Sequence, residues 1–232
     1  MTFRRFIRRE WLQLIILIAP FAIIPFIWSL LPAQVPTHWG WRGKANGWMS
    51  KDFGAFMLPV INVAIALLLG LASRIDPKIK KQGGTSNTIH RLRLVITSFF
   101  LIFFVINMEI ALSIETPFAS IVDMHRAPIF AIALLLMLVG HYLPGLQPNY
   151  FIGVRTPWTL EDPENWRLTH KMTGPLWVIS SIAFLPIYLI APSSVAQAVF
   201  IAYLGIVIIL PISYSFWIFL RTKRAFARVP RS

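Results

Sequence analysis

The chain contains no cysteine among its 232 residues, and this absence excludes disulfide bonds and thiolate metal sites. Acidic residues are also scarce: nine Asp and Glu stand against 22 Lys and Arg, so the net charge is +13. Such a basic balance often indicates nucleic-acid binding, but here the basic residues flank apolar runs. We therefore interpret them as determinants of membrane topology that also attract anionic lipid, and we expect no direct contact with nucleic acid.

Recognisable catalytic and metal-binding motifs are missing as well. No HExxH spacing or comparable ligand pattern occurs. A metal site would require folding to join two histidines from distant segments, either His38 with His125 or His141 with His170. We therefore expect no bound metal and no other cofactor. No nucleophile or carboxylate pair accompanies a histidine at recognisable spacing, so a membrane-embedded enzyme that modifies lipid or peptide is the last of three hypotheses.

Apolar sequence in long runs is what the chain has in abundance. Hydrophobic residues make up 56% of it, and the mean hydropathy is +0.66. Since about 20 apolar residues cross the core of a bilayer, six runs are predicted to span it: 11–31, 53–73, 94–114, 128–143, 175–190 and 195–220. The first run exceeds the about 7–15 residues of a signal-peptide core, so we predict a retained helix. The predicted fold class is all-α, a polytopic bundle of six transmembrane helices.

The basic residues are distributed unevenly among the segments that join these runs. With the N-terminus inside, the four inner segments hold four, six, three and five of the 22 Lys and Arg. The outer loops hold only Arg42, Lys44, Lys51 and Arg126. Because cytoplasmic loops are enriched in Lys and Arg, we predict that both termini and the loop 144–174 face the cytoplasm.

The first outer loop, residues 31–52, is rich in glycine and tryptophan. Glycines at this density let the backbone turn tightly and return to the membrane. Two interpretations stay open: tryptophans anchored at the level of the lipid headgroups, or a folded cap over the outer mouth of the bundle with His38 near its centre. The candidate functional residues of this loop are Pro36, His38, Trp39, Gly43, Gly47 and Trp48.

The inner loop contains a predicted helix start. Asp162 is suited to cap a helix and Pro163 to its first position, and the helix is predicted to run to about Met172. Gly174 and Pro175 would then stop it before the fifth span. The inner loop would thus carry a short helix separate from the membrane span that follows.

Residues at spacings of three, four and seven share one face of that helix: Trp166, Thr169, His170 and Thr173. Before the helix, Pro157 pushes Thr156 out of helical space, so Arg155 lies on an extended or turning segment. The predicted arrangement is a short amphipathic helix at the inner interface, with Arg155 reaching under the bundle. Either this arrangement binds a partner, or Arg155 and Trp166 hold the inner end of the bundle together.

The third apolar run contains a carboxylate, Glu109, two residues after Asn107. A carboxylate inside a bilayer is costly and normally faces the bundle interior or a water-filled cavity. Asn62 in the second run is a candidate partner, and Glu115 and Asp123 would extend the acidic region toward the outer surface. These features favour, as an alternative function, a proton-coupled small transporter or exporter that uses Glu109. Six spans would make half a transporter, so this alternative requires a homodimer.

The two loops together resemble a known family. The inner loop reads Asn149-x-x-x-Gly153-x-Arg155-Thr156-Pro157-Trp158-Thr159, followed by Trp166-x-x-Thr169-His170-x-x-x-Gly174. This pattern is similar to the signature of the SdpI-type immunity proteins of bacteria. The outer stretch, from Pro36-x-His38-Trp39 to Gly43 and Gly47, resembles the membrane domain of unknown function that commonly precedes that signature. We thus expect two regions, a two-span region at 1–93 and a four-span SdpI-like region at 94–232.

The resemblance implies a multi-pass protein of the bacterial cytoplasmic membrane that resists a secreted toxic peptide. For some members it also implies a transcriptional repressor held at the membrane. Immunity or sensing without enzymatic activity is therefore the first hypothesis, with the lipid bilayer, a toxic peptide and a repressor as expected partners. The inner candidate residues are those of the motif: Asn149, Gly153, Arg155, Thr156, Pro157, Trp158, Trp166, Thr169 and His170.

Overall fold

The fold is dominated by long helices. A computed structural model of the chain describes residues 3–40, 45–81, 87–115 and 126–227. Six helices in these ranges are long and apolar enough to cross a membrane. They are α1 (Phe3–Ile27), α2 (Lys51–Ile75), α4 (Asn87–Glu115), α5 (Ala127–Tyr142), α7 (Pro163–Ile190) and α8 (Ser193–Ala227). The predicted helical membrane bundle with six spans is confirmed.

The chain forms two compact units, and both are discontinuous in sequence. Unit 1 consists of Met1–Leu69 and Arg93–Ile132, and unit 2 consists of Gly70–Leu92 and Ala133–Ser232. This division follows packing and differs from the division into sequence regions 1–93 and 94–232, which stays a prediction. Of the residues singled out in the sequence, Gly43, Asp123 and His125 lie outside the described residues.

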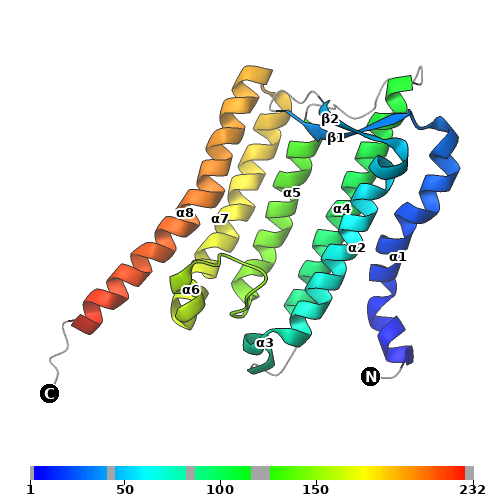
Figure 1. Cartoon of the computed structure of the whole chain (residues 1–232). Helices are drawn as coiled ribbons and strands as arrows, with labels where there is room; N and C mark the ends of the chain where they lie inside the picture. Colours follow the sequence, from blue (N-terminus) through cyan, green and yellow to red (C-terminus); the bar gives the residue numbers. More distant parts are fainter. Residues whose placement is uncertain (1–2, 41–44, 82–86, 116–125, 228–232) are drawn as a thin grey trace. The chain divides into compact units, whose positions relative to one another are not determined.

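Unit 1 contains a feature that helix periodicity did not predict, an antiparallel hairpin of β1 (Gln34–Trp39) and β2 (Ala45–Ser50). The hairpin joins α1 to α2, with the short 3-10 helix η1 (Trp28–Leu30) before it (Figure 1). Val35 of β1 is fully buried and packs with α1, α2 and α4. The buried core of unit 1 contains Ile24, Leu31, Val35, Ala55, Leu58, Phe104, Met108 and Ala111.

Unit 2 combines the long helices α7 and α8, which pack against each other (Figure 1), with three short ones. The short helices are α3 (Pro77–Lys81), η2 (Leu143–Gly145) and α6 (Pro157–Glu161). A buried apolar cluster lies beside them and contains Ile79, Ile89, Leu92, Leu143, Leu146 and Trp166. The segment between η2 and α7, which carries the first part of the motif, is therefore packed on the buried cluster of unit 2.

The prediction that Gly174 and Pro175 end a short interfacial helix is wrong. Helix α7 runs without a break from Pro163 to Ile190. Pro175 lacks a backbone donor but lies inside this helix, and Gly174 is closely packed, since a Cβ there would lie 2.6 Å from Cδ of Pro144 and 2.7 Å from the carbonyl oxygen of Gly140. Gly174 therefore allows η2 and α5 to approach α7 closely and does not end the helix. The helix predicted to lie at the interface has the face of Trp166, Thr169, His170 and Thr173 buried in unit 2.

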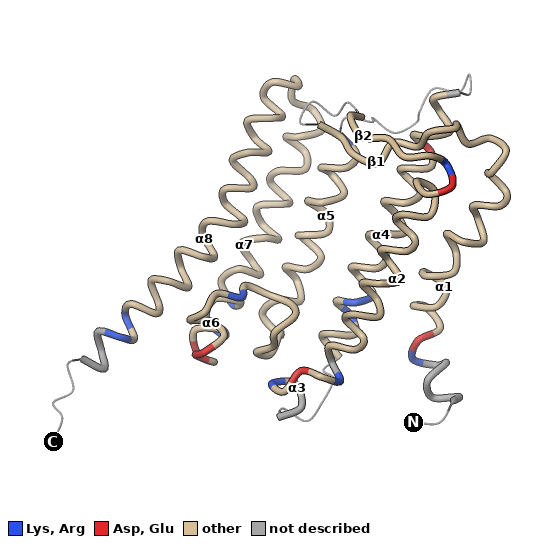
Figure 2. The backbone as a smooth tube through the Cα atoms, in the orientation of Figure 1, with Lys and Arg blue, Asp and Glu red and all other residues tan. Residues whose placement is uncertain are grey.

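Charged residues lie mostly near the helix ends, and the middles of the long helices are almost free of them (Figure 2). Many large apolar side chains are exposed on these helices, for example Phe26 at 85% and Ile190 at 84%. In water such a surface would be an aggregation hazard, whereas in a bilayer it faces lipid tails. The pattern is that of a membrane-embedded chain.

Candidate functional site

The motif of unit 2 occupies residues 149–174, called the motif segment below. It begins with a turn at Asn149, whose side chain is buried. Its Oδ1 accepts from the backbone N–H of Phe151 at 2.8 Å and of Ile152 at 2.7 Å. Its Nδ2 donates to the carbonyl oxygens of Gln147 at 2.9 Å and Ile152 at 3.1 Å. Asn149 therefore uses both ends of its amide to shape the local backbone, as Asn side chains in turns do.

Gly153 follows this turn with a φ of 119°, a conformation that favours glycine. The next backbone N–H, that of Val154, donates to Nε2 of His170 at 3.0 Å. Nδ1 of His170 lies 2.8 Å from the carbonyl oxygen of Trp166, which only accepts, so Nδ1 carries the proton. His170 is thus a buried, neutral ring with both nitrogens engaged, stacked on Trp166 at 4.1 Å between centroids.

The segment after Gly153 enters α6, a helix that the sequence analysis did not predict. Thr156 is extended at φ −88° and ψ 158°, as expected for a residue before proline, and it caps α6. Thr156 and Thr159 form a reciprocal capping box, with Pro157 at the start of the helix. The hydroxyl of Thr159 also donates to the carbonyl oxygen of Val154 at 2.8 Å. These bonds fix the direction in which the chain leaves Gly153.

A second network ties α6 and the start of α7 to α8. Nε1 of Trp158 donates to Oγ of Ser215 at 2.8 Å, and Nδ2 of Asn165 donates to the carbonyl oxygen of Ser215 at 3.0 Å. The hydroxyl of Thr169 donates to Oδ1 of Asn165 at 3.0 Å. Sequence reasoning missed Ser215, a fully buried hydroxyl whose only signal is a polar residue in an apolar run. Separately, Nε1 of Trp166 donates to the carbonyl oxygen of Leu146 at 2.8 Å.

Asp76 is a second residue that sequence reasoning missed. Its Oδ1 accepts from the backbone N–H of Lys78 at 2.8 Å and of Ile79 at 3.4 Å, which caps α3. Its Oδ2 accepts from the backbone N–H of Tyr150 at 2.7 Å. The pair Asp76-Pro77 carries the same helix-start signal as Asp162-Pro163, where Oδ1 of Asp162 accepts from the N–H of Glu164 at 2.9 Å.

Arg155 differs from the other polar motif residues because its side chain is exposed. One guanidinium nitrogen donates to the carbonyl oxygen of Tyr150 at 2.6 Å, which leaves other N–H groups directed to the surroundings. The ammonium of Lys78 donates to the carbonyl oxygen of Leu160 and lies 4.9 Å from the centre of the Tyr150 ring. Two cations therefore contact Tyr150, Arg155 at its backbone carbonyl oxygen and Lys78 at its ring.

Two further cations, Arg167 and Lys171, are exposed on α7. Arg167 forms a bidentate pair with Glu164, with distances of 2.7 and 2.6 Å. An exposed pair of this kind contributes little to stability. The neighbouring face of α7 holds Trp166, Thr169, His170 and Thr173, which are all buried within this one continuous helix, as the predicted shared face requires.

In unit 1 a side chain of α4 holds the hairpin by a hydrogen bond to β1. The amide of Asn107 on α4 donates to the carbonyl oxygen of Pro36 at 3.0 Å. His38 is exposed on β1 opposite Gly47, and a Cβ on Gly47 would lie 2.8 Å from Cβ of His38. Nδ1 of His38 lies 2.5 Å from Oδ1 of Asn46. The histidine is therefore held at the hairpin surface rather than enclosed at the centre of a cap.

The tryptophans of the hairpin have different surroundings. Trp39 packs edge-on against Phe103 of α4 at 6.3 Å between ring centroids. Trp48 is 45% exposed. One aromatic side chain therefore helps to seat the hairpin, and the other is available at its surface.

The predicted partnership between Asn62 and Glu109 is not present. Nδ2 of Asn62 donates to the carbonyl oxygen of Thr97 at 3.1 Å, and Asn107 bonds the hairpin. Glu109 is half-buried on α4, and its use in proton-coupled transport stays a prediction. Of the two histidines that could have met at a metal on the inner side, His141 is exposed and His170 has both nitrogens engaged in hydrogen bonds.

Comparison with known proteins bears on the family resemblance. The SdpI/YfhL protein family matches residues 145–215, which include the whole motif segment, α7 and most of α8. The resemblance to the SdpI family is confirmed. A domain of unknown function (DUF1648) matches residues 15–63, which include the hairpin. The Immunity protein SdpI of Bacillus subtilis (strain 168) is 22% identical over 175 residues, covering 74% of this chain and 77% of that protein. No solved structure matches.

Proposed function

We propose that this chain is an immunity protein of the bacterial cytoplasmic membrane that protects the cell from a secreted toxic peptide. The likeness to Immunity protein SdpI over three quarters of both chains supports this proposal, as does the six-span fold. The observation that carries it is the motif segment itself, because its internal bonds present one exposed cation, Arg155, on a rigid frame.

The proposal assigns different roles to the two polar ends. With both termini in the cytoplasm, as the distribution of Lys and Arg favours, the hairpin faces outward and meets the toxic peptide first. Trp48 and His38 are exposed there and supply an aromatic and a polar contact. Arg155 and Lys171 then face the cytoplasm, where they would contact an acidic surface of a repressor. No catalytic step is part of this function.

The proposal is tested by expressing the chain in a bacterium that is sensitive to such a peptide and measuring survival against peptide concentration. We expect the intact chain to raise the tolerated concentration, and Arg155→Ala to abolish that gain at equal membrane abundance. Arg167→Ala is the matched control, because Arg167 is an exposed arginine already paired with Glu164. Equal survival with and without the intact chain would contradict the proposal.

A further inference from the structure

The C-terminal part of α8 carries a column of two aromatic rings and a cation. The rings of Tyr214 and Trp217 are stacked, with their centroids 5.8 Å apart and 24° between their planes. The guanidinium carbon of Arg221 lies 5.3 Å from the centre of the Trp217 ring. These residues are three and four positions apart, so they share one helix face, on which Trp217 is 51% exposed and Arg221 is exposed as well. An aromatic ring therefore holds a guanidinium at the surface of unit 2.

This column stands where the apolar surface of α8 gives way to basic residues. Leu210, which lies two helical turns before Trp217 on the same face, is exposed, and so is Leu220. Lys and Arg occur on α8 only toward its C-terminal end (Figure 2). Tryptophan is enriched at the headgroup level of a bilayer, and a long basic side chain reaches from there to the lipid phosphates. The face of Trp217 and Arg221 thus has the composition of a boundary between acyl chains and headgroups.

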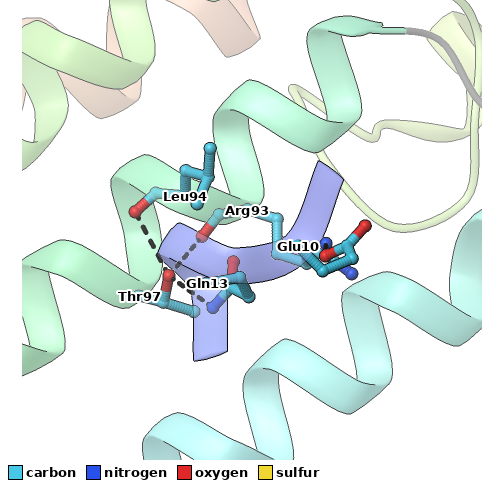
Figure 3. Close-up of polar contacts among 5 residues, drawn as sticks. All are labelled: Glu10, Gln13, Arg93, Leu94 and Thr97. Atoms are coloured by element: carbon cyan, nitrogen blue, oxygen red, sulfur yellow. Dashed lines mark hydrogen bonds and ion pairs between the residues drawn. The ribbon is translucent and has the colours of Figure 1, made fainter. Parts of the chain in front are cut away.

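The C-terminal part of the chain is basic without any acidic residue to balance it. No Asp or Glu follows Glu164 in the sequence. Five basic residues lie from position 221 onward: Arg221, Lys223, Arg224, Arg228 and Arg231. By contrast, Arg93 of α4 forms an ion pair with Glu10 of α1 in unit 1, and both side chains are mostly buried (Figure 3). Helix α8 offers Arg221 no such carboxylate, so an anion from the surroundings suits it.

The position of the column decides which kind of anion fits. Trp217 and Arg221 belong to a stretch that is long and apolar enough to cross a membrane, Ser193–Lys223. A soluble phosphate or an acidic protein would meet the guanidinium from the water and leave the indole ring uncovered. A phospholipid covers both, because its phosphate accepts hydrogen bonds from the guanidinium and its acyl chain lies along the apolar face. An anionic headgroup fits better than a zwitterionic one, whose own ammonium competes for the phosphate.

A second cation at the same helix end has different surroundings. Nζ of Lys223 lies 6.0 Å from the centre of the Phe219 ring. That ring is stacked on Trp158 of α6, with centroids 5.9 Å apart. Lys223 therefore lies toward the side of α8 on which α6 packs, about 200° around the helix axis from Arg221. The two cations contribute the same charge to this end of α8, but only Arg221 is stacked on the exposed indole ring.

We propose that the guanidinium of Arg221, held over Trp217, binds the phosphate of one anionic phospholipid, and that an acyl chain of this lipid lies along Trp217 and Leu210. This lipid site differs from a general attraction of basic residues for anionic lipid, because it depends on one guanidinium and one ring. It anchors the C-terminal end of α8 in the leaflet that this end reaches. The lipid site does not depend on the immunity function.

The test uses the full chain in detergent micelles and counts bound lipids by native mass spectrometry during titration with dioleoylphosphatidylglycerol or dioleoylphosphatidylcholine. We expect the first phosphatidylglycerol to bind about tenfold more tightly than the first phosphatidylcholine, and Arg221→Gln to lose most of this preference. Lys223→Gln is the matched control, because it removes the same charge from the same helix end, and it should keep the preference within about twofold. Equal losses in the two variants would overturn the proposal, as would an intact chain without any preference.

A second pair of variants tests the aromatic ring. Trp217→Leu keeps an apolar side chain but removes the ring beneath the guanidinium, so the preference for phosphatidylglycerol should fall about threefold. Phe216→Leu, at the neighbouring exposed aromatic residue, is the control and should leave the preference unchanged. An undiminished preference in Trp217→Leu would contradict the lipid site. Binding of polyglutamate in place of phosphatidylglycerol, lost in Arg221→Gln, would assign the surface to an acidic protein and overturn the proposal.

Discussion

The ring of His170 lies against Gly153 so closely that a Cβ at position 153 would stand 2.3 Å from Nε2. The same nitrogen accepts the backbone N–H of Val154 at 3.0 Å. One histidine therefore sets both the residue type at 153 and the path of the chain after it. The two parts of the motif, separated by the start of α7, form a single packed structure.

Gly153→Ala should destabilise the protein by about 2–4 kcal/mol, because alanine disfavours the positive φ and its Cβ would overlap the His170 ring. Thermal unfolding of the detergent-purified protein measures the effect. Gly205→Ala is the control, since the nearest atom to an added Cβ there is 4.0 Å away, and it should be neutral or stabilising. Similar unfolding temperatures for the two variants would contradict the packing described at Gly153.

His170→Phe should cost about 1–3 kcal/mol, because phenylalanine retains stacking on Trp166 but leaves the N–H of Val154 without its acceptor. The measurement is again thermal unfolding, combined with survival of cells challenged with peptide. If the destabilised variant retains immunity when its abundance is matched to that of the intact chain, His170 is structural. A stable His170→Phe variant without immunity would instead assign the ring a direct role.

Asp76→Ala should be more harmful than Asp162→Ala, although each aspartate caps a helix. Asp76 is 1% exposed and its removal leaves the N–H groups of Lys78, Ile79 and Tyr150 without an acceptor, for a cost of about 2–4 kcal/mol. Asp162 is half-buried and caps a single N–H, for about 1 kcal/mol. Chemical unfolding of both variants in detergent compares them, and an equal loss would refute the tie between α3 and the motif segment.

Asn107→Leu should loosen the hairpin, because it removes the donor to the carbonyl oxygen of Pro36. Hydrogen exchange of β1 and β2, followed by mass spectrometry, should become at least about fivefold faster, as for the loss of a bond worth about 1 kcal/mol. Asn46→Ala is the control, since its contact to His38 is at the exposed surface. Unaltered exchange in Asn107→Leu would mean that other contacts hold the hairpin.

The predicted orientation is open to a simple test because the chain has no cysteine of its own. In intact cells, a membrane-impermeant thiol reagent should label Asn46→Cys in the hairpin and leave Lys171→Cys unlabelled until the membrane is permeabilised. Both positions are outside or at the edge of apolar stretches, so labelling reports the side of the membrane. The reverse pattern would place the hairpin in the cytoplasm and contradict the proposed meeting with a secreted peptide.

Several elements follow from local sequence. The six spans are visible as apolar runs, and Asp162-Pro163 marks the start of α7 because capping depends on neighbouring residues. Proline at 157 fixes Thr156 in an extended conformation for the same local reason. Glycine and proline at 174 and 175 misled the prediction, since α7 continues through both and the glycine lies in close contact with Pro144.

The class of the protein, its apolar spans and its family motif were thus fixed by residue order, because hydrophobicity and helix capping act over a few positions. The partners of the motif side chains were decided by tertiary structure. Tyr150 bonds Asp76 at a separation of 74 residues, and Trp158 bonds Ser215 at a separation of 57. Hydrogen bonds between such distant residues depend on how the helices pack, which no local pattern specifies. Only that packing distinguishes Arg155, left exposed, from His170, enclosed and fully bonded.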